Sequence, residues 1–205
     1  MRATVTFAFA SLLLAAGAHA QSDRASLLER AGESRAKGSP DAPVLVYEIA
    51  DFQCPYCAAF ARDVFPHIDS AYIRPGRVQW VFVNLPMPSH HAAWTASEAA
   101  LCAGAVSDRF WVMHDRLYVA GREWIDADDP AAVVAGYARD AGVAMDEFTD
   151  CVEHDRVVPI LLQDVIFGSR VTGTPTFIID NQETIVGVKS FDDWVVVLER
   201  VLRGK

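Results

Sequence analysis

Positive charge is scarce in this sequence. Its 205 residues carry 18 Lys and Arg against 27 Asp and Glu, which gives a formal net charge of −9. Nucleic-acid binders need a basic stripe to neutralise phosphates, and none is visible, so the sequence argues against a nucleic-acid partner. With 52% hydrophobic residues the chain can bury a core, which excludes extensive disorder and predicts one domain, or one domain with an insertion.

Long apolar runs are also nearly absent. The longest, residues 5–16, stands at the start of the chain and is followed by Ala18-His19-Ala20, a small-x-small pattern. We interpret residues 1–20 as a cleaved signal peptide and expect a periplasmic or secreted protein. No later stretch approaches the length of a membrane span. The cleavage point carries no cysteine, which argues against a lipoprotein. Residues 21–43 are polar, rich in turn residues, and interpreted as a short leader.

Cysteine is limited to Cys54, Cys57, Cys102 and Cys151. In an oxidising compartment an even number of cysteines suggests pairing, so two bridges are expected. Joining Cys102 to Cys151 would close a loop of about fifty residues and stabilise the fold by about 4 kcal/mol. The alternative is a second redox pair, although the two residues lack Cys-x-x-Cys spacing.

The sequence Cys54-Pro55-Tyr56-Cys57 lies between an apolar run at 44–50, predicted to be a buried strand, and an amphipathic helix predicted at 58–73. The dithiol therefore begins a helix, where unpaired backbone N–H groups and the helix dipole favour a thiolate. Pro55 suits the first helical position because it lacks an N–H that would go unpaired there. Half of a zinc site and a structural bridge remain alternatives for the isolated motif.

Glu48 interrupts the apolar strand six residues before Cys54. A carboxylate in such a strand often faces solvent or marks a sheet edge. If it is buried beneath the dithiol, its pKa rises and it can accept or donate the proton of Cys57.

The remaining pattern predicts a mixed α/β chain. Pro66 should kink or divide the first helix. A second strand, parallel to the first, is predicted at 78–85, and residues 90–170 carry only helical patterns. The other predicted elements are helices at 94–105, 110–120, 130–141 and 157–167, an antiparallel hairpin at 176–180 and 184–188, and a closing helix at 191–202.

Several histidines and tryptophans occur in the helical stretch. His90, His91 and His114 lack His-x-x-x-His spacing and a nearby carboxylate pair, so we interpret them as hydrogen-bonding residues and predict no metal site. The tryptophans are predicted to be core residues, with a small-ligand pocket among them as an alternative; they are Trp94, Trp111 and Trp124. No cofactor is expected.

Val171-Thr172-Gly173-Thr174-Pro175 precedes the hairpin, where a proline is usually a trans edge residue but can also form a cis turn. Taken with the dithiol motif about 120 residues earlier, the chain from residue 44 onward resembles the DsbA-like family of thiol:disulfide oxidoreductases. The resemblance implies a thioredoxin-like domain at 44–89 and 171–205, split by an inserted helical domain at 90–170.

The resemblance also implies roles for the site residues. Cys54 would be the exposed nucleophile and Cys57 its buried partner, shielded by the helix and by Tyr56. Pro175 would be cis and face them, and Thr174 would offer its backbone to an extended substrate. The dipeptide Pro55-Tyr56 differs from the Pro-His of the strongest oxidases in the family, so no imidazolium would help the Cys54 thiolate.

The expected activity is oxidation of reduced exported proteins, with a membrane quinone-linked protein as the reoxidant that the resemblance implies. A disulfide isomerase or reductase could use the same dithiol, but such relatives are dimers with a separate N-terminal domain, for which residues 21–43 are too short, so a monomer is expected. The alternative to an enzyme is a non-catalytic module that binds zinc through all four cysteines.

Overall fold

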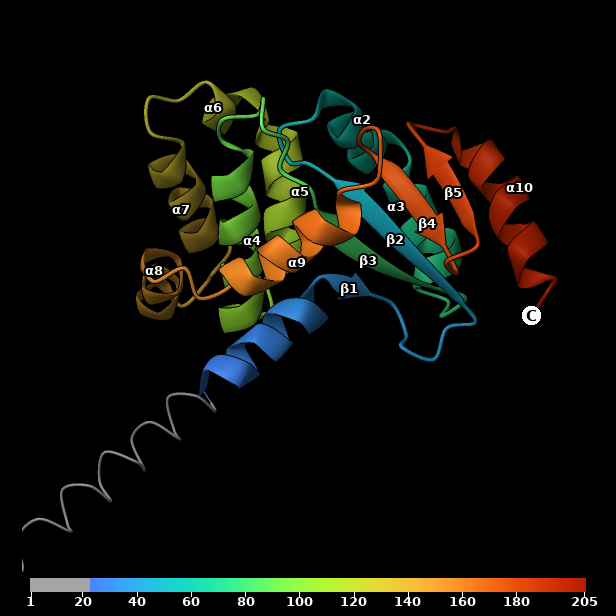
Figure 1. Ribbon diagram of the computed structural model, residues 1–205, viewed down its shortest axis with the longest axis horizontal. Helices are drawn as coiled ribbons and strands as arrows, with labels where there is room; N and C mark the ends of the chain where they lie inside the picture. Colours follow the sequence, from blue (N-terminus) through green and yellow to red (C-terminus); the bar gives the residue numbers. More distant parts are fainter. Residues whose placement is uncertain (1–22) are drawn as a thin grey trace, which may run out of the picture.

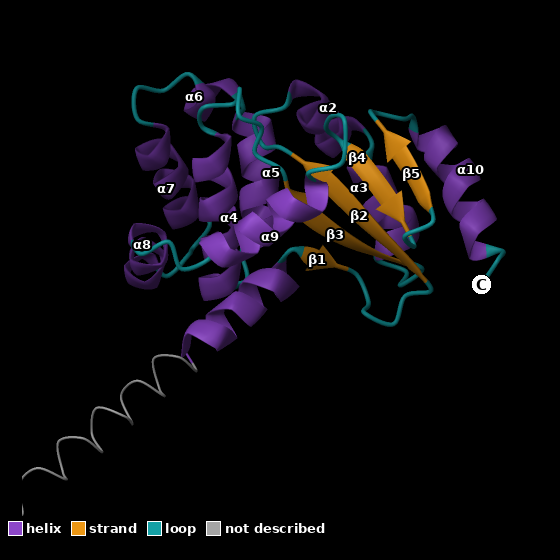
Figure 2. Cartoon of the chain, in the orientation of Figure 1, coloured by secondary structure: helices purple, strands orange, loops and turns teal. Residues whose placement is uncertain are grey.

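In the computed structural model, residues 23–205 are described and form a mixed α/β fold; the predicted signal peptide, residues 1–20, lies outside them. Figures 1 and 2 show one sheet with helices on both of its faces and a group of helices beyond one edge. The strand order is β1-β3-β2-β4-β5. Within residues 23–205, no helix has the length and apolar character required to cross a bilayer.

The structure contains more helices than the sequence predicted. The strands are β1 (Ala36–Lys37), β2 (Val44–Ala50), β3 (Val78–Asn84), β4 (Thr176–Ile179) and β5 (Glu183–Val186). The helices are α2 (Pro55–Asp63), α3 (Phe65–Ile68), η1 (Asp69–Ile73), α4 (Ala93–Ser107), α5 (Phe110–Ala120), α6 (Arg122–Ile125), α7 (Pro130–Asp140), α8 (Met145–Glu153), α9 (Val158–Gly168) and α10 (Phe191–Leu202).

Strands β2 and β3 form the parallel centre of the sheet, as predicted. They are in register from Val44 opposite Val78 to Ala50 opposite Asn84. The other pairings are antiparallel: β4 with β2, β5 with β4, and β1 with β3. Both central strands are apolar along nearly their whole length because helices cover both faces of the sheet.

Different helices cover the two faces. Helices α2, α3 and α10 share a buried cluster with Trp80 and Phe177 of the sheet. Helix α9 lies across the opposite face, where Gly168 allows close approach: a Cβ there would lie 3.0 Å from Leu85 and 3.1 Å from Ile49. This packing places the N-terminus of α2 at the end of the sheet where β2 finishes.

The helices between β3 and β4 form a second core around α4, which contacts α5, α7, α8 and α9 (Figure 2). The four helices predicted here are confirmed, with ends shifted by at most two residues. Asp129 caps α7 by accepting from the Ala132 amide at 3.0 Å, and Pro130 follows as the first helical residue. The helices α6 and α8 were missed. A single turn such as α6 carries little periodic signal, whereas the nine residues of α8 do carry an amphipathic pattern, which the sequence analysis did not use.

The helix predicted at 58–73 is divided at Val64. Pro66 cannot donate a hydrogen bond to the preceding turn, and α2 ends at Asp63 before α3 begins at Phe65. A π-helical turn, η1, then completes the segment. The predicted kink is thus confirmed, as a break two residues before the proline.

The short leader at residues 21–43 contains regular structure that the sequence analysis did not predict. Residues 23–34 are helical, and β1 pairs with β3 at the edge of the sheet. Ala31 is fully buried, and Arg35 forms an ion pair with Asp164 of α9. Hydrophobic contacts of Leu27, Leu28 and Ala31 with the helical core explain the ordering that the local sequence, with its turn residues, did not predict.

The three tryptophans differ in burial. Trp124 is fully buried and its indole donates to the Leu117 carbonyl at 2.9 Å, so it is a core residue as predicted. Trp111 is half-buried between Phe65 and Phe110. Trp94 is 38% exposed, which corrects the prediction for that residue. It stands at the second position of α4 and faces outward, whereas Ala92 and Ala93 just before it are buried.

Candidate active site

The two cysteines of the dithiol occupy the first turn of α2. Cys54 is the N-cap residue, with extended backbone, and Pro55 is the first helical residue. Both thiols are free. Cys54 is 5% exposed and Cys57 is fully buried, so the expected exposed nucleophile is in fact largely covered, although it is the more accessible sulfur. Tyr56 is 68% exposed and therefore does not shield Cys57 as expected.

The environment of Cys54 favours its thiolate. The pKa of Cys54 is lowered to about 5, chiefly because the Cys57 thiol can hydrogen-bond to the charged sulfur. The Thr174 side chain and the backbone of Cys57 and Tyr56 lower it further, against an opposing contribution from burial. The low pKa agrees with the expected effect of a helix N-terminus, but the neighbouring thiol contributes more than the helix.

Cys57 has the opposite behaviour. Burial raises the pKa of Cys57 well above its usual range, and the nearby Cys54 sulfur raises it further. The two sulfurs therefore hold different protonation states at neutral pH: a thiolate at Cys54 and a thiol at Cys57.

The loop before β4 faces the dithiol. The Thr174–Pro175 peptide bond is cis, as the resemblance implied. In its protonated form Cys54 donates to the Thr174 carbonyl, whose oxygen lies 3.4 Å from Sγ, and this contact brings together two motifs separated by 120 residues. The Thr176 hydroxyl donates to the Gly173 carbonyl at 2.7 Å and holds the loop in its turn.

Glu48 lies inside the protein and not at a surface. It is fully buried in β2, and the Trp80 indole donates to its Oε2 at 2.8 Å. Burial raises its pKa to about 8, and the Trp80 hydrogen bond opposes that rise. Because Val44, Val46 and Glu48 alternate with residues of the other face, Glu48 points to the face covered by α2.

Asp51, to which the sequence analysis gave no role, connects the dithiol loop to the helical part. Its fully buried carboxylate accepts from the Gln53 amide at 2.6 Å and the Met87 amide at 2.7 Å, and lies 2.8 Å from His90 Nδ1. Its carbonyl accepts from the Cys54 amide at 3.0 Å. An acidic residue three positions before the first cysteine was the available signal, but its partners come from a distant part of the chain.

Tyr118 of α5 is a second residue that the sequence analysis missed. Its hydroxyl donates to the Asp51 carbonyl at 3.3 Å, and its ring lies 5.1 Å from that of Phe52. Burial raises the pKa of Tyr118 well above its usual range, and charges at Cys57, Glu48, Asp51 and Cys54 add to the effect. Helix α5 therefore forms one wall of the site.

The three histidines are hydrogen-bonding residues, as predicted. His90 pairs with Asp51, and His91 contacts Gln53 Nε2 at 3.4 Å and the Ile125 carbonyl at 3.1 Å. His114 is fully buried and its Nδ1 lies 2.8 Å from Asp115 Oδ1. No three His, Cys, Asp or Glu side chains group as metal ligands in the part of the chain that the structure describes.

Cys102 and Cys151 form a disulfide between α4 and α8, with their Cα atoms 5.9 Å apart. The predicted pairing is confirmed. It also contradicts the zinc module, which would need both of these sulfurs as thiolate ligands.

Comparison with known proteins agrees with this geometry. The family model described as Thioredoxin matches residues 30–200. Disulfide bond formation protein D of Bacillus subtilis is 26% identical over 189 residues, which cover 85% of this chain and 82% of that protein. Two other curated relatives are matched over less than half of their own length.

Solved structures show the same fold. BdbD from Bacillus subtilis, in its oxidised form, superposes with a TM-score of 0.72 at 23% identity, over 83% of this chain and 93% of that one. Alpha-DsbA1 of Wolbachia pipientis superposes with a TM-score of 0.71 at 20% identity, over 83% of this chain and 91% of that one. The chain therefore belongs to the thioredoxin family, as a DsbA-like thiol:disulfide oxidoreductase with a helical insertion.

Proposed function

We propose that this protein is an exported oxidase that donates the Cys54–Cys57 disulfide to reduced substrate proteins. The observation that carries the proposal is the Cys54 pKa of about 5. At pH 7 the thiolate would exceed the thiol about a hundredfold. A stabilised thiolate favours the reduced protein, so the disulfide form is a strong oxidant toward ordinary thiols.

The exchange takes place in two displacements. A substrate thiolate attacks Cys54 Sγ, the bond between Cys54 and Cys57 breaks, and Cys57 leaves as a thiolate. A second substrate thiolate then attacks the substrate sulfur of the mixed disulfide, and Cys54 leaves as a thiolate. The substrate loses two electrons and gains a disulfide, and the protein gains both electrons as its dithiol.

Glu48 is proposed to exchange the proton of Cys57. The raised pKa of Cys57 means that the departing sulfur takes up a proton near neutral pH. Glu48 is buried on the α2 side of the sheet, and its pKa of about 8 keeps a proton available at pH 7. A carboxylic acid with such a pKa suits proton exchange in both directions.

The loop containing Thr174 and Pro175 is proposed to dock the substrate. The Thr174 carbonyl already lies 3.4 Å from Cys54 Sγ, so a peptide bound along this loop would bring its cysteine to the reactive sulfur. An extended substrate segment can bind beside this loop through backbone hydrogen bonds, as an added strand does. Because backbone groups are the same in every sequence, such binding accepts many different substrates.

The proposal includes cleavage of the signal peptide at residues 1–20 and action in the periplasm or outside the cell. The substrates would be reduced exported proteins, and a membrane quinone-linked protein would restore the disulfide. We further propose a monomer whose thioredoxin-like domain, 44–89 and 171–205, is split by the insertion at 90–170. The helix at residues 23–34 would belong with the inserted helical domain, because it contacts the helical core. Strand β1 would belong with the thioredoxin-like domain, because it joins the sheet.

The reduction potential of the Cys54–Cys57 couple tests the direction of exchange. The protein is equilibrated in glutathione buffers, and its free thiols are counted after alkylation. The Cys102→Ser, Cys151→Ser double variant serves as a matched control, because it leaves only one couple to titrate. An oxidase should have a potential above about −180 mV, the region of protein disulfide isomerase, whereas a value near −270 mV would contradict the proposal and support a reductase.

A further inference from the structure

His114 has an unusual environment for a residue outside the dithiol. It is fully buried in α5, and its ring is surrounded by aromatic side chains: the centroids of Trp111, Tyr118 and Phe82 lie 4.8, 4.9 and 5.3 Å away. Its Nδ1 faces Asp115 Oδ1, but its Nε2 has no hydrogen-bond partner among residues 23–205. Since the two nitrogens lie on opposite sides of the ring, Nε2 points away from Asp115 and into the core.

A second buried polar atom lies on the same side of the sheet. Glu48 Oε1 also has no hydrogen-bond partner in the described part of the chain. Glu48 is the register partner of Phe82, whose ring packs edge-on against His114. The Phe65 ring lies 5.5 Å from Trp80, the hydrogen-bond partner of Glu48, and 5.9 Å from His114. Glu48, through its partner Trp80 and its register neighbour Phe82, and His114, through its own ring contacts, therefore adjoin the same pair of rings, those of Phe65 and Phe82.

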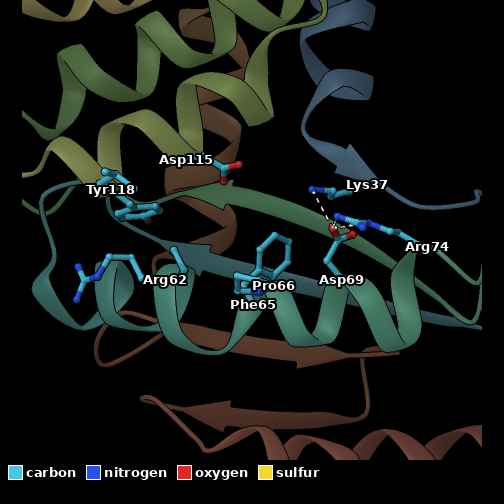
Figure 3. Close-up of a pocket in the computed structure, with 10 residues that line it drawn as sticks. Lys37, Arg62, Phe65, Pro66, Asp69, Arg74, Asp115 and Tyr118 are labelled. Atoms are coloured by element: carbon cyan, nitrogen blue, oxygen red, sulfur yellow. Dashed lines mark hydrogen bonds and ion pairs between the residues drawn. The ribbon is translucent and has the colours of Figure 1, made fainter.

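The other side of His114 leads to solvent. The Asp115 side chain is 68% exposed and lines an open pocket of about 470 Å³, together with Tyr118, Lys37 and residues of α2 and α3. Figure 3 shows Asp115 and Tyr118 on α5, across the pocket from Phe65 and Pro66. Asp115 is therefore bound to a buried imidazole and also accessible to water.

We propose that His114 relays protons between buried Glu48 and solvent at Asp115. This inference rests on the proposed exchange between Glu48 and Cys57. Glu48 and Cys57 are both fully buried, so a proton that moves between them needs a route out of the protein during each redox cycle. An imidazole with one nitrogen directed inward and the other bonded to an exposed carboxylate supplies such a route.

The proton balance closes over one cycle. When the dithiol is reoxidised, Cys57 gives its proton to Glu48, Glu48 gives one to His114 Nε2, and His114 Nδ1 gives one to Asp115, which releases it to water. When the protein next donates its disulfide, Cys57 leaves as a thiolate and one proton returns along the same groups in reverse. The two half-cycles therefore restore the original protonation of His114.

The charged groups around His114 agree with this role. Burial lowers the pKa of His114, Asp115 on the same helix raises it, and Lys37 from β1 lowers it. Tyr118 and Glu48 are the other titratable groups that face this region, and both have raised pKa values because of burial. His114 is consequently neutral near pH 7, so one of its nitrogens is available to accept a proton.

The test measures the step in which Cys57 displaces glutathione from a mixed disulfide with Cys54. Its rate is followed in H₂O and D₂O between pH 6 and 8, for the wild type, His114→Phe and Asp115→Asn. His114→Phe should slow the step about tenfold, less than the loss of a positioned acid or base itself, and should abolish most of the D₂O effect. Asp115→Asn, at an exposed position that does not threaten folding, should slow it less. The reduction potential should stay unchanged in both.

Exposed His154, which pairs with Asp150 on α8, provides the matched control: His154→Phe and Asp150→Asn should leave the rate unchanged. Unaltered rate and D₂O sensitivity in Asp115→Asn and in a folded His114→Phe would overturn the relay; if His114→Phe fails to fold, Asp115→Asn decides. Glu48→Gln separates the relay from the proposed function. If Glu48→Gln displaces glutathione slowly while the His114 and Asp115 variants keep the wild-type rate, only the relay is rejected. If Glu48→Gln itself keeps the wild-type rate, the proton exchange on which the relay rests is rejected.

Discussion

The two cysteine pairs of this protein are almost equally buried and chemically different. Cys54 is 5% exposed, and Cys57, Cys102 and Cys151 are fully buried. The first pair is free and lies within one helical turn at the start of α2. The second pair is a disulfide that joins α4 to α8 across 49 residues of sequence. Burial alone therefore does not distinguish a reactive pair from a structural one.

The difference lies in what surrounds each sulfur. Cys54 lies beside the Cys57 thiol, Thr174 and the first-turn backbone, which together lower its pKa to about 5. Cys102 and Cys151 lie in the interior of helices, where every backbone amide is already paired within the helix. A second thiol beside a cysteine at a helix N-terminus therefore favours reactivity, whereas two cysteines in the interiors of neighbouring helices form a lasting link. The following predictions would break or sharpen this contrast.

The largest expected effect is the loss of exchange in Cys54→Ser. This variant removes the low-pKa sulfur and should show no oxidation of a reduced model protein and no mixed disulfides. Cys57→Ser keeps the reactive sulfur but cannot release a bound substrate internally, so covalent adducts should accumulate. Non-reducing gels of both variants, expressed in an exporting bacterial host, provide the measurement. Equal adducts in both variants would contradict the assigned roles.

Removing the second pair should affect stability and spare activity. The Cys102→Ser, Cys151→Ser variant should lose about 4 kcal/mol of unfolding free energy, because the loop that the bridge closes spans 49 residues. Denaturant unfolding measures the loss, and oxidation of a reduced protein measures the activity. A variant that kept its stability and lost its activity would show that this pair is also part of the redox path.

Glu48 links the reactive pair to the stability of the fold. Its folded pKa, about 8, lies above the unfolded value of 4.5, so the folded state holds the extra proton between these values. The contribution of this group to the free energy of unfolding is complete below pH 4.5 and declines as the pH rises toward 8, by roughly 4–5 kcal/mol. Glu48→Gln should flatten this decline in denaturant unfolding between pH 5 and 8. An unchanged slope would mean that Glu48 titrates normally.

The smallest expected effect concerns Tyr56. Because this side chain is 68% exposed and uncharged, replacing it changes the charge near Cys54 with little effect on packing. Tyr56→His should lower the Cys54 pKa below its present value of about 5 and raise the reduction potential by roughly 30 mV, equivalent to about 1.4 kcal/mol. The rate of Cys54 alkylation against pH measures the pKa, with Tyr56→Phe as the matched control. A shift of equal size in Tyr56→Phe would exclude charge as the cause.

Much of the fold could be predicted from the sequence because its signals are local. The apolar run of β2, the β-branched and aromatic residues of β4 and β5, and the Asp129-Pro130 start of α7 are each visible in a short stretch of the chain. The leader could not be predicted, because residues 23–34 are ordered by contacts with the helical core and β1 by pairing with β3. Trp94 is exposed, contrary to the prediction, because it lies on the outward side of the first turn of α4, in which Ala93 and Ala96 are buried.

The candidate site divides in the same way. The sequence by itself determined the reactive pair, since a Cys-x-x-Cys between a strand and a helix fixes both the spacing and the helix N-terminus. It also placed Glu48 six residues before Cys54 in the preceding strand, and the resemblance to the DsbA-like family implied that the loop before β4 faces the pair. The place of Cys54 at the helix N-terminus also predicted which sulfur holds the charge. Only the tertiary structure buried Cys57 completely and brought Asp51 and Tyr118 to the dithiol loop. Their roles depend on burial and on partners more than thirty residues away in the chain, and pKa values follow the surroundings of a group in space.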